Sequence, residues 1–501
     1  MTWPSSSPVR IAVVGSGPAG VFACDALLTW ADKNSHEIVV DLFDTLPVPF
    51  GLLRHGVAPD HPRIKGIADN LWEIGQDPRI RFLGNVHFGT DITLEDLRRH
   101  HHAVIFATGA LADRTMGIPG EDLTGSYGAA EFVTWYDGHP DVDPEWDLSA
   151  RRAAVVGVGN VALDIARMLV RTAEQLEATD IPEHVRTGFG DTAARTVSVI
   201  GRRGPAWAKF TTLELREMDK VDGVTVVVEP AELDDDEVSR RHRESDRRAG
   251  QIYAVLKKWA TAQTEAGHAD ADAAEAAALA AGEKVVRFRF NRAPVEILGS
   301  GGAGGPDAGG PDSGGPDSGG PDAADHVTGL RLERTEPDGS GLRMTGETEV
   351  LPVDAVYSAV GYRSAALEGI PFDDSTATIP NRAGRVLDGP DGEPIPGLFT
   401  AGWIKRGPSG VIGTNRSCAT ESVNELLSDL EAGLLPDPES PDPQSVRELL
   451  DSRGIKVIDG IAWAAIDARE RELGESAGRE RTKLPGRDEM LDVGLGADSS
   501  R

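Results

Sequence analysis

A glycine-rich turn near the N-terminus has the spacing of a dinucleotide-binding loop. Gly15, Gly17 and Gly20 follow an apolar, β-branched run and precede a helix-forming stretch. In such a turn the first glycine permits the tight bend, the second lets a pyrophosphate approach the backbone, and the third lets the helix pack on the strand. Asp44 ends the next apolar run. An acid at that place binds ribose hydroxyls of an adenosine without a 2′-phosphate.

A second turn of the same kind lies further along the chain. Gly157 and Gly159 follow another apolar run, and Ala162 stands at the third position, where alanine is an allowed replacement. The next apolar run is followed by Arg202 and Arg203 instead of an acid. Because two guanidinium groups bind a phosphate strongly, this turn is predicted to bind NADP. The alternative is that both arginines are solvated loop residues.

Together the two turns predict electron transfer. The acid beside the first turn suits FAD and the arginines beside the second suit NADP, so the chain is predicted to pass a hydride from nicotinamide to flavin. That step needs the two rings in contact and water kept away, rather than a side-chain acid. Only Cys24 and Cys418 occur. They cannot build an iron–sulfur cluster and are not a Cys-x-x-Cys pair, so single electrons have to leave to a separate protein.

The elements that must position these turns are strands followed by helices. Apolar runs at 10–14 and 152–156 lead into the turns, and helices are expected at 21–30 and 163–171. Further buried strands are expected at 38–43, 103–109, 196–200 and 354–361, at 397–402, and as a strand pair at 284–290 and 294–298. This alternation predicts the α/β fold class, with two Rossmann-like dinucleotide-binding domains, one for FAD and one for NADP.

The order of the turns predicts that the NADP domain is inserted in the FAD domain. The chain is expected to leave the first sheet after Gly109 and to return after Gly361. The FAD-binding domain is therefore predicted to be discontinuous, with residues 1–111 and 363–501, and the NADP-binding domain to span 112–362. Gly-Gly-Pro-Asp occurs four times within 299–325. This composition has nothing to bury, so a disordered loop is predicted there.

Composition excludes several classes of protein. The chain has 501 residues and a formal net charge of −30, so its overall field repels nucleic acid and anionic membranes. No apolar run is long enough to span a membrane, and the first residues lack the pattern of a signal peptide. We therefore expect a cytoplasmic protein without a nucleic-acid partner, a membrane span or a metal site.

The sequence resembles the adrenodoxin reductase-like ferredoxin–NADP reductases, a group with bacterial FprA-type members, along nearly its whole length. Beside the glycine turns, the resemblance rests on the strings at 46–62, 157–164, 201–217 and 402–415. It implies ferredoxin–NADP⁺ reductase activity, in which NADPH reduces FAD by hydride transfer and the flavin passes single electrons to a ferredoxin. A cytochrome P450 is a candidate acceptor downstream of that ferredoxin.

The resemblance also implies which residues bind the cofactors. For FAD they are Gly15, Gly17, Ala19, Gly20, Asp44, Leu52, Val86, Trp403, Gly410, Val411 and Ile412. For NADP they are Gly159, Asn160, Val161, Ala162, Arg202, Arg203, Glu214 and Gly410. His61 and Glu217 match a polar pair close to the reacting rings and are the predicted catalytic residues, in proton uptake or carboxamide orientation. The alternatives are that His61 only caps a turn and that Glu217 is an exposed helix acid.

The chain departs from the family pattern at several points, and other functions stay open. Asp44 stands where glutamate is common, Phe50 replaces a frequent tryptophan, and 299–325 is an insertion. A run of basic residues forms either a docking face for ferredoxin or a solvated helix: Lys209, Arg240, Arg241, Arg243, Arg247 and Arg248. The rival functions are an NADPH-dependent flavin monooxygenase and a non-enzymatic NADP-sensing interaction protein.

Overall fold

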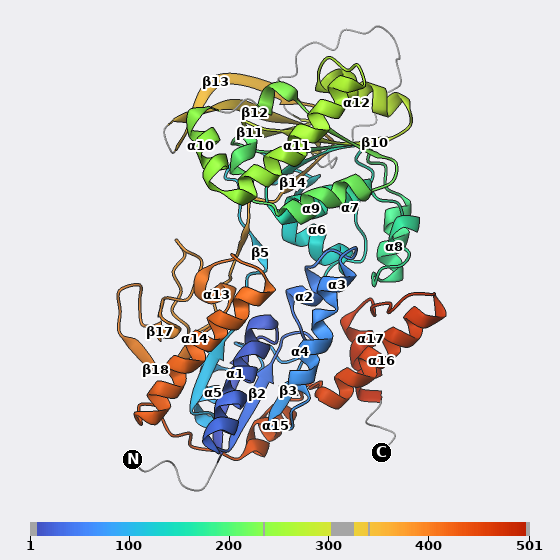
Figure 1. The fold of residues 1–501 in the computed structure, drawn as a ribbon. Coiled ribbons are helices and arrows are strands. Elements are labelled where there is room, and N and C mark those ends of the chain that lie inside the picture. The colour runs from blue at the N-terminus through green and yellow to red at the C-terminus, as the bar shows by residue number, and fades with distance from the viewer. Residues whose placement is uncertain (1–7, 234–235, 302–324, 339–340, 497–501) are drawn as a thin grey trace.

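The chain folds into two lobes, one above the other in Figure 1. The computed structural model describes residues 8–233, 236–301, 325–338 and 341–496. The lower lobe combines elements from both ends of the chain, and the upper lobe is built from the middle. The disordered loop predicted at 299–325 lies almost wholly outside the described residues.

The lower lobe is centred on a seven-stranded sheet with the order β16-β17-β18-β4-β1-β2-β3. β1, β2, β3, β4 and β18 are parallel, and the short β16 and β17 pair antiparallel at one edge. Parallel strands buried on both faces favour continuous apolar runs, and β1 is buried at every position. The strands are β1 (Val9–Val14), β2 (Ile38–Phe43), β3 (Ile80–Leu83), β4 (Ala103–Phe106), β16 (Asn381–Arg382), β17 (Arg385–Leu387) and β18 (Pro394–Thr400).

Helices from both chain ends cover this sheet. α1 packs along α14, and both bury small and aliphatic side chains against the strands. The C-terminal helices α16 and α17 pack on each other at the side of the lobe (Figure 1). The helices are α1 (Pro18–Asn34), α4 (Ile67–Gly75), α5 (Leu94–His100), α14 (Ile412–Glu431), α15 (Pro443–Ser452), α16 (Gly460–Ser476) and α17 (Arg487–Gly496).

The upper lobe contains a six-stranded, wholly parallel sheet with the order β6-β14-β7-β8-β10-β9. A second, three-stranded antiparallel sheet, β11-β12-β13, lies beside it. The parallel strands are β6 (Ser126–Gly128), β7 (Arg152–Val156), β8 (Thr196–Ile200), β9 (Val224–Val228), β10 (Lys284–Arg289) and β14 (Ala355–Ser358). The antiparallel strands are β11 (Arg292–Gly299), β12 (Val327–Asp338) and β13 (Gly341–Leu351).

One expected pairing is wrong. β10 and β11 were expected to form a strand pair, but β10 joins the parallel sheet and β11 pairs with β12. Asn291 lies between them with a φ of 55°. This left-handed conformation turns the chain from one sheet to the other, and asparagine is one of the few side chains that tolerates it.

Helices of the upper lobe pack around an aromatic and aliphatic core. Phe132 and Trp135 of α6 stack with ring centroids 5.7 Å apart in that core. The helices are α6 (Ala129–Tyr136), α7 (Asn160–Val170), α8 (Glu183–Gly190), α9 (Thr212–Glu217), α10 (Glu237–Ser245), α11 (Arg247–Glu265) and α12 (Ala271–Ala280). Among the described residues, no helix is both long and apolar enough to cross a membrane.

The chain passes between the lobes twice, and the two crossings pair with each other. β5 (Ala112–Asp113) leads upward and β15 (Tyr362–Arg363) leads back, and they form a two-stranded antiparallel sheet. In Figure 1 β5 lies at the junction of the lobes. The two crossings therefore form one paired connection.

Candidate active site

Both glycine turns lie at the carboxyl edges of their sheets, directly after β1 and β7. The N–H of Gly15 donates to the carbonyl of Phe43 at 2.9 Å, and the N–H of Gly157 donates to the carbonyl of Ile200 at 3.0 Å. The first turn thus lies against the end of β2 and the second against the end of β8. Two equivalent turns in one chain are what the sequence predicts.

The three glycines of the first turn have different surroundings. Gly15 has a φ of +106°, and a Cβ there would lie 2.5 Å from the carbonyl oxygen of Ala107. A Cβ on Gly20 would lie 1.9 Å from the carbonyl oxygen of Gly15. A Cβ on Gly17, the N-cap of α1, would meet nothing within 4 Å. Gly15 and Gly20 are therefore required by packing, whereas Gly17 leaves space at a helix N-terminus, where a phosphate fits.

The second turn repeats this arrangement. Gly157 has a φ of +144°, and a Cβ there would lie 2.3 Å from the carbonyl oxygen of Ala359, which follows β14. A Cβ on Gly159, the N-cap of α7, would meet nothing within 4 Å. Ala162 is fully buried. The open position again faces a helix N-terminus and suits a phosphate.

Asn160 and Val161 begin helix α7 beside the second turn. The Asn160 Oδ1 accepts a hydrogen bond from the N–H of Thr211 at 2.7 Å. Thr211 is the N-cap of α9, and its hydroxyl accepts from the N–H of Glu214. Asn160 therefore ties the start of α9 to the second turn, while Val161 is half-buried.

Asp44 is hydrogen-bonded to the first turn itself. Its carboxylate accepts from the Ser16 N–H at 2.8 Å, from the Ser16 hydroxyl at 2.5 Å and from the Leu46 N–H at 2.9 Å. The buried Val86 donates its N–H to the Asp44 carbonyl at 2.9 Å. Burial raises the pKa of the Asp44 carboxyl, and the hydrogen bonds from Ser16 and Leu46 oppose this. Asp44 thus fixes the turn, a task additional to the ribose contact predicted for it.

Leu52 is brought to the first turn by the short helix α2 (Leu52–His55). The preceding Gly51 has a φ of +48°, and a Cβ on it would lie 3.4 Å from the Cα of Gly17. The N–H of Phe50 donates to the Ser16 carbonyl at 3.1 Å. The segment that carries Leu52 therefore runs directly along the turn.

The C-terminal return reaches the same edge of the lower sheet. A Cβ on Gly402, after β18, would lie 2.6 Å from the Cβ of Ala19 in α1. The helix that follows, α13 (Trp403–Arg406), therefore begins against α1. Residues 410–412 then lead into α14, whose N-cap, Val411, is 67% exposed. Both ends of the chain thus meet where the FAD site is predicted.

Arg202 and Arg203 lie in the loop after β8, at the same edge as the second turn. Arg202 is exposed, and its backbone carbonyl accepts from the Thr335 hydroxyl at 2.7 Å. The guanidinium of Arg203 lies over the ring of Trp207, 4.9 Å from its centroid. Of the two arginines, Arg203 is thus positioned by an aromatic ring.

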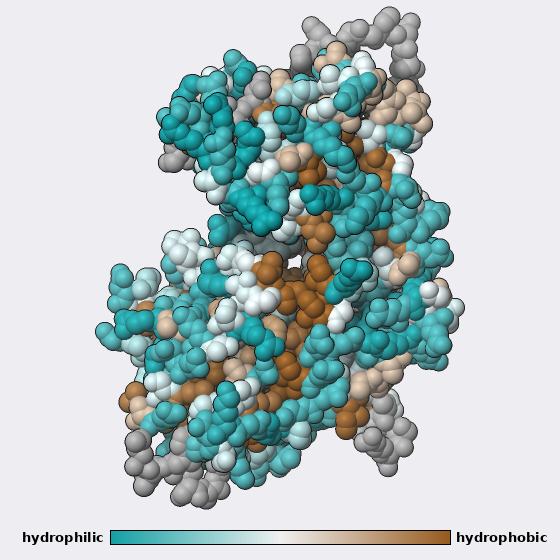
Figure 2. All heavy atoms as spheres, in the orientation of Figure 1, coloured by the Kyte–Doolittle hydropathy of each residue, from teal (hydrophilic) through white to brown (hydrophobic). Residues whose placement is uncertain are grey.

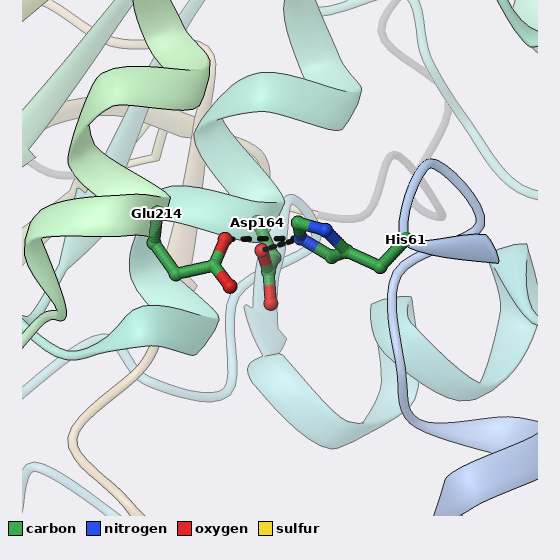
Figure 3. A group of neighbouring side chains, drawn as sticks. All are labelled: His61, Asp164 and Glu214. Carbon is green, nitrogen blue, oxygen red and sulfur yellow. Dashed lines mark ion pairs between the residues drawn. The ribbon is translucent and has the colours of Figure 1, made fainter. Parts of the chain in front are cut away.

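His61 meets acids of the other lobe. It is the N-cap of α3 (Pro62–Lys65) in the lower lobe, but its side chain makes no cap. Its Nε2 lies 2.9 Å from an oxygen of Glu214 on α9 and 3.5 Å from one of Asp164 on α7. Figure 3 shows the three side chains pointing toward one another. The alternative that His61 only caps a turn is therefore wrong.

Arg167 completes this cluster from α7. Its guanidinium is fully buried, and Nη2 lies 2.7 Å from Asp164 Oδ1 and 2.7 Å from His61 Nε2. Arg167 also makes a two-point ion pair with Asp60, at 2.5 and 3.0 Å. The Arg167 guanidinium and the carboxylates of Asp60, Asp164 and Glu214 therefore surround the imidazole of His61.

The acids keep His61 protonated. Burial lowers the pKa of His61, but hydrogen bonds to Asp164 and Glu214 outweigh it, and Arg167 opposes them only in part. The pKa of His61 is raised to about 10. The raised pKa favours the imidazolium form of His61, with Glu214 and Asp164 as acceptors of its Nε2 proton.

The predicted pair of His61 with Glu217 is not what the structure shows. Glu217 is the last residue of α9, and its carboxylate accepts from Lys220 Nζ at 2.6 Å. Glu214, a predicted NADP contact, is the acid beside His61 and is only 6% exposed. Glu217 lies at the last position of α9 and pairs instead with Lys220 in the turn that follows the helix.

Three residues of the cluster were missed in the sequence: Asp60, Asp164 and Arg167. A signal was present, since Asp164 and Arg167 are three residues apart on a helix that starts at the second turn, which is the spacing of a helical ion pair. The donor atoms of His61, Asp164 and Glu214 lie within 4.8 Å of one another, a spacing that a metal ion could use. Arg167 already supplies a positive charge to these carboxylates.

Apolar side chains gather around a hollow in the middle of the molecule, where the two lobes meet (Figure 2). The exposed large apolar residues include Leu213 of α9 in the upper lobe and Val411 in the lower lobe. Parallel sheets with dinucleotide-type glycine turns and a charged cluster between the lobes define an α/β oxidoreductase fold of the flavoprotein type.

Comparison with known proteins identifies the family. No protein-family model matches the sequence. NADPH-ferredoxin reductase FprA of Mycobacterium tuberculosis is 40% identical over 505 residues, which cover 98% of this chain and 100% of the relative. The mitochondrial NADPH:adrenodoxin oxidoreductase of Arabidopsis thaliana is 37% identical over 497 residues, covering 97% and 95%. The structure of M. tuberculosis FprA in complex with NADPH matches with a TM-score of 0.83 at 39% identity, covering 98% and 100%. The chain therefore belongs to the family of FprA-type and adrenodoxin reductases.

Proposed function

We propose that this protein is an NADPH-dependent ferredoxin reductase that uses FAD. The observation that carries the proposal is the repetition of one turn at two sheet edges, with an acid beside the first and two arginines beside the second. The acid suits the unphosphorylated ribose of FAD, and the arginines suit the 2′-phosphate of NADP. The names of the relatives, which are NADPH-ferredoxin and NADPH:adrenodoxin reductases, support the same activity.

The FAD site is proposed at the first turn. The open position at Gly17 and the N-terminus of α1 would receive the pyrophosphate, and the Asp44 carboxylate would meet the ribose. Bound FAD would accept a hydride from NADPH and release electrons one at a time. The remaining residues proposed to contact it are Gly15, Ala19, Gly20, Leu52, Val86, Trp403, Gly410, Val411 and Ile412.

The NADP site is proposed at the second turn. Gly159 and the N-terminus of α7 would receive the pyrophosphate, and Arg202 and Arg203 the 2′-phosphate. Asn160, Val161, Ala162 and Gly410 are proposed to line the rest of this site. Two domains follow from this assignment: 1–111 with 363–501 for FAD, and 112–362 for NADP.

His61 is proposed to supply positive charge and a proton at the junction of the sites. Its imidazolium is held by Glu214 and Asp164, so it stays charged at neutral pH. A cation there stabilises negative charge that develops nearby, and its proton is available for uptake. Glu214 is then a positioning residue for His61.

The test is spectroscopic. Purified protein is mixed with NADPH under anaerobic conditions, and the visible spectrum is recorded before and after a ferredoxin is added, with cytochrome c as the final acceptor. A yellow protein that bleaches with NADPH and reduces cytochrome c only with ferredoxin supports the proposal. A colourless protein contradicts it, and so does a flavin that reoxidises only with an organic co-substrate and oxygen, as in a monooxygenase.

A further inference from the structure

A large cavity lies in the upper lobe away from both glycine turns. Its volume is about 840 Å³. Residues at the starts of β7 and β8 line it, together with residues along β10, one side of α12 and the segment before β14. The lining reaches toward the carboxyl edge at Arg289, whose carbonyl accepts from the N–H of Gly201. It includes no residue of either glycine turn and neither Arg202 nor Arg203, so the cavity is lined by other residues than the proposed NADP site.

Five arginines line this cavity: Arg151, Arg152, Arg195, Arg287 and Arg289. Two of them are neutralised, since Arg152 pairs with Asp354 at 2.6 Å and Arg287 with Asp272 and Glu275 at 2.6 and 2.7 Å. For the other three, no carboxylate lies within ion-pair distance among the described residues. The lining therefore carries more positive than negative charge, in a chain whose net charge is −30.

The unpaired charges converge from two neighbouring strands. Arg289 is half-buried on β10 and meets only the hydroxyl of Ser198, at 3.4 Å. Burial and the neighbouring Arg287 lower the pKa of Arg289, and the carboxylates of Glu275, Glu349 and Glu232, beyond ion-pair distance, oppose this only in part. Beside the cavity lining, the Nζ of Lys284, close to Arg195, is buried without a hydrogen-bond partner. Partly buried cations without a paired carboxylate are costly, and an anion would offset that cost.

Apolar side chains also line the cavity. They are Ala276 and Leu279 of α12, Leu351 at the end of β13, and Pro352 and Val353 after it, while α12 also contributes Asp272 and Glu275. Apolar side chains beside a row of guanidinium groups suit an organic body that carries phosphate, because guanidinium pairs bind phosphate oxygens and the apolar side chains cover the remainder. We propose that this cavity binds a phosphate-bearing small molecule at a site distinct from the two dinucleotide turns.

The test measures anion binding by the full-length protein saturated with FAD and NADP⁺. Inorganic pyrophosphate and AMP are titrated separately by calorimetry at constant ionic strength. Saturable binding of either, with one site per chain, is expected. Tighter binding of AMP identifies an organic phosphate as the source of the group, and tighter binding of pyrophosphate identifies the free anion. No saturable binding of either overturns the proposal.

Variants locate the site. Arg195→Gln with Arg289→Gln is expected to weaken binding by about tenfold or more. The control Arg343→Gln removes an exposed arginine that pairs with Glu336, and it should leave binding unchanged. Unchanged affinity in the double variant overturns the proposal.

A second variant is expected to strengthen binding, an effect that misfolding cannot produce. Asp272 is 84% exposed and is one of the two carboxylates that pair with Arg287, so Asp272→Asn removes one negative charge from the cavity lining with little effect on the fold. Its binding should tighten about threefold. Equal or weaker binding by this folded variant contradicts the proposal.

Discussion

Asp60 and Arg167 form a two-point ion pair that joins the lobes. Nε of Arg167 lies 2.5 Å from Asp60 Oδ2, and Nη2 lies 3.0 Å from Oδ1. Asp60 precedes α3 in the lower lobe, and Arg167 lies on α7 in the upper lobe. Together with the contact of His61 to Glu214, this pair holds the two lobes so that the carboxyl edges of their sheets face each other.

Replacing Arg167 by methionine should destabilise the protein. The guanidinium is fully buried among Asp60, Asp164 and Glu214, and its loss removes a cation that contacts all three, leaving Asp60 with Arg171 and the other two with His61. Breaking a buried pair in this way costs about 3–5 kcal/mol. Urea unfolding measures the effect. Arg447→Gln, which breaks an exposed pair with Asp451, is the control and should cost about 1 kcal/mol or less.

The charge of His61 should persist well above neutral pH. Its pKa is about 10 instead of 6.5, because the hydrogen bonds to Asp164 and Glu214 outweigh burial. The stabilisation that this pairing provides is fully present below pH 6.5 and is lost as the pH rises through about 10. The proton resonances of the imidazole, assigned with His61→Gln, report the titration. A midpoint near 6.5 would disprove the assignment.

Two acids of α9 should affect that titration differently. Glu214→Gln removes a carboxylate 2.9 Å from Nε2 and should lower the pKa of His61. Glu217→Gln is the matched control, because Glu217 pairs with Lys220 instead, and it should leave the titration unchanged. The reverse result would restore the pair predicted from the sequence.

Alanine substitutions at two glycines of the first turn should have different effects, one on FAD affinity and the other on stability. A Cβ on Gly17 meets nothing within 4 Å, so Gly17→Ala should fold normally and lose FAD affinity by about tenfold. Gly20→Ala places a Cβ 1.9 Å from the Gly15 carbonyl oxygen and should lower the free energy of unfolding by about 1–3 kcal/mol. Flavin fluorescence and urea unfolding measure the two effects. Equal FAD affinity in Gly17→Ala and wild type would remove Gly17 from the proposed site.

The arginines after β8 should select the phosphorylated nucleotide. Changing Arg202 and Arg203 together to alanine should raise the KM for NADPH about tenfold or more and leave the KM for NADH unchanged. Flavin reduction followed with each nucleotide measures both. An equal rise for NADPH and NADH would contradict the assignment of the 2′-phosphate.

The sequence predicted the strands and turns well. The strands at 38–43, 152–156 and 196–200 begin and end as expected. They are recognisable because parallel strands buried on both faces are continuous apolar runs bounded by glycine or charge. The helices after both turns start earlier than expected, since Gly17 and Gly159 are themselves the N-caps and Pro18 occupies a position that favours helix starts.

The charged cluster could be predicted only in part. Glu214 and Glu217 are both acids, and residues three apart lie near one face of a helix. The sequence could therefore distinguish them only if the position at which α9 ends were known. The partners of His61 come from segments far apart in the chain, and no local pattern reports such distant contacts. The same applies to β10 and β11, where one residue, Asn291, decides which sheet each strand joins.

The paired crossings β5 and β15 bear on how the protein is made. The lower sheet needs β4 beside β18, whereas every strand of the upper sheet lies between them in the chain. During synthesis the ribosome therefore releases the whole upper sheet before it releases β18. Until then, the edge of β4 that pairs with β18 has no partner strand. Because unpaired strand edges promote aggregation, the chain is most prone to aggregate during this interval of its synthesis.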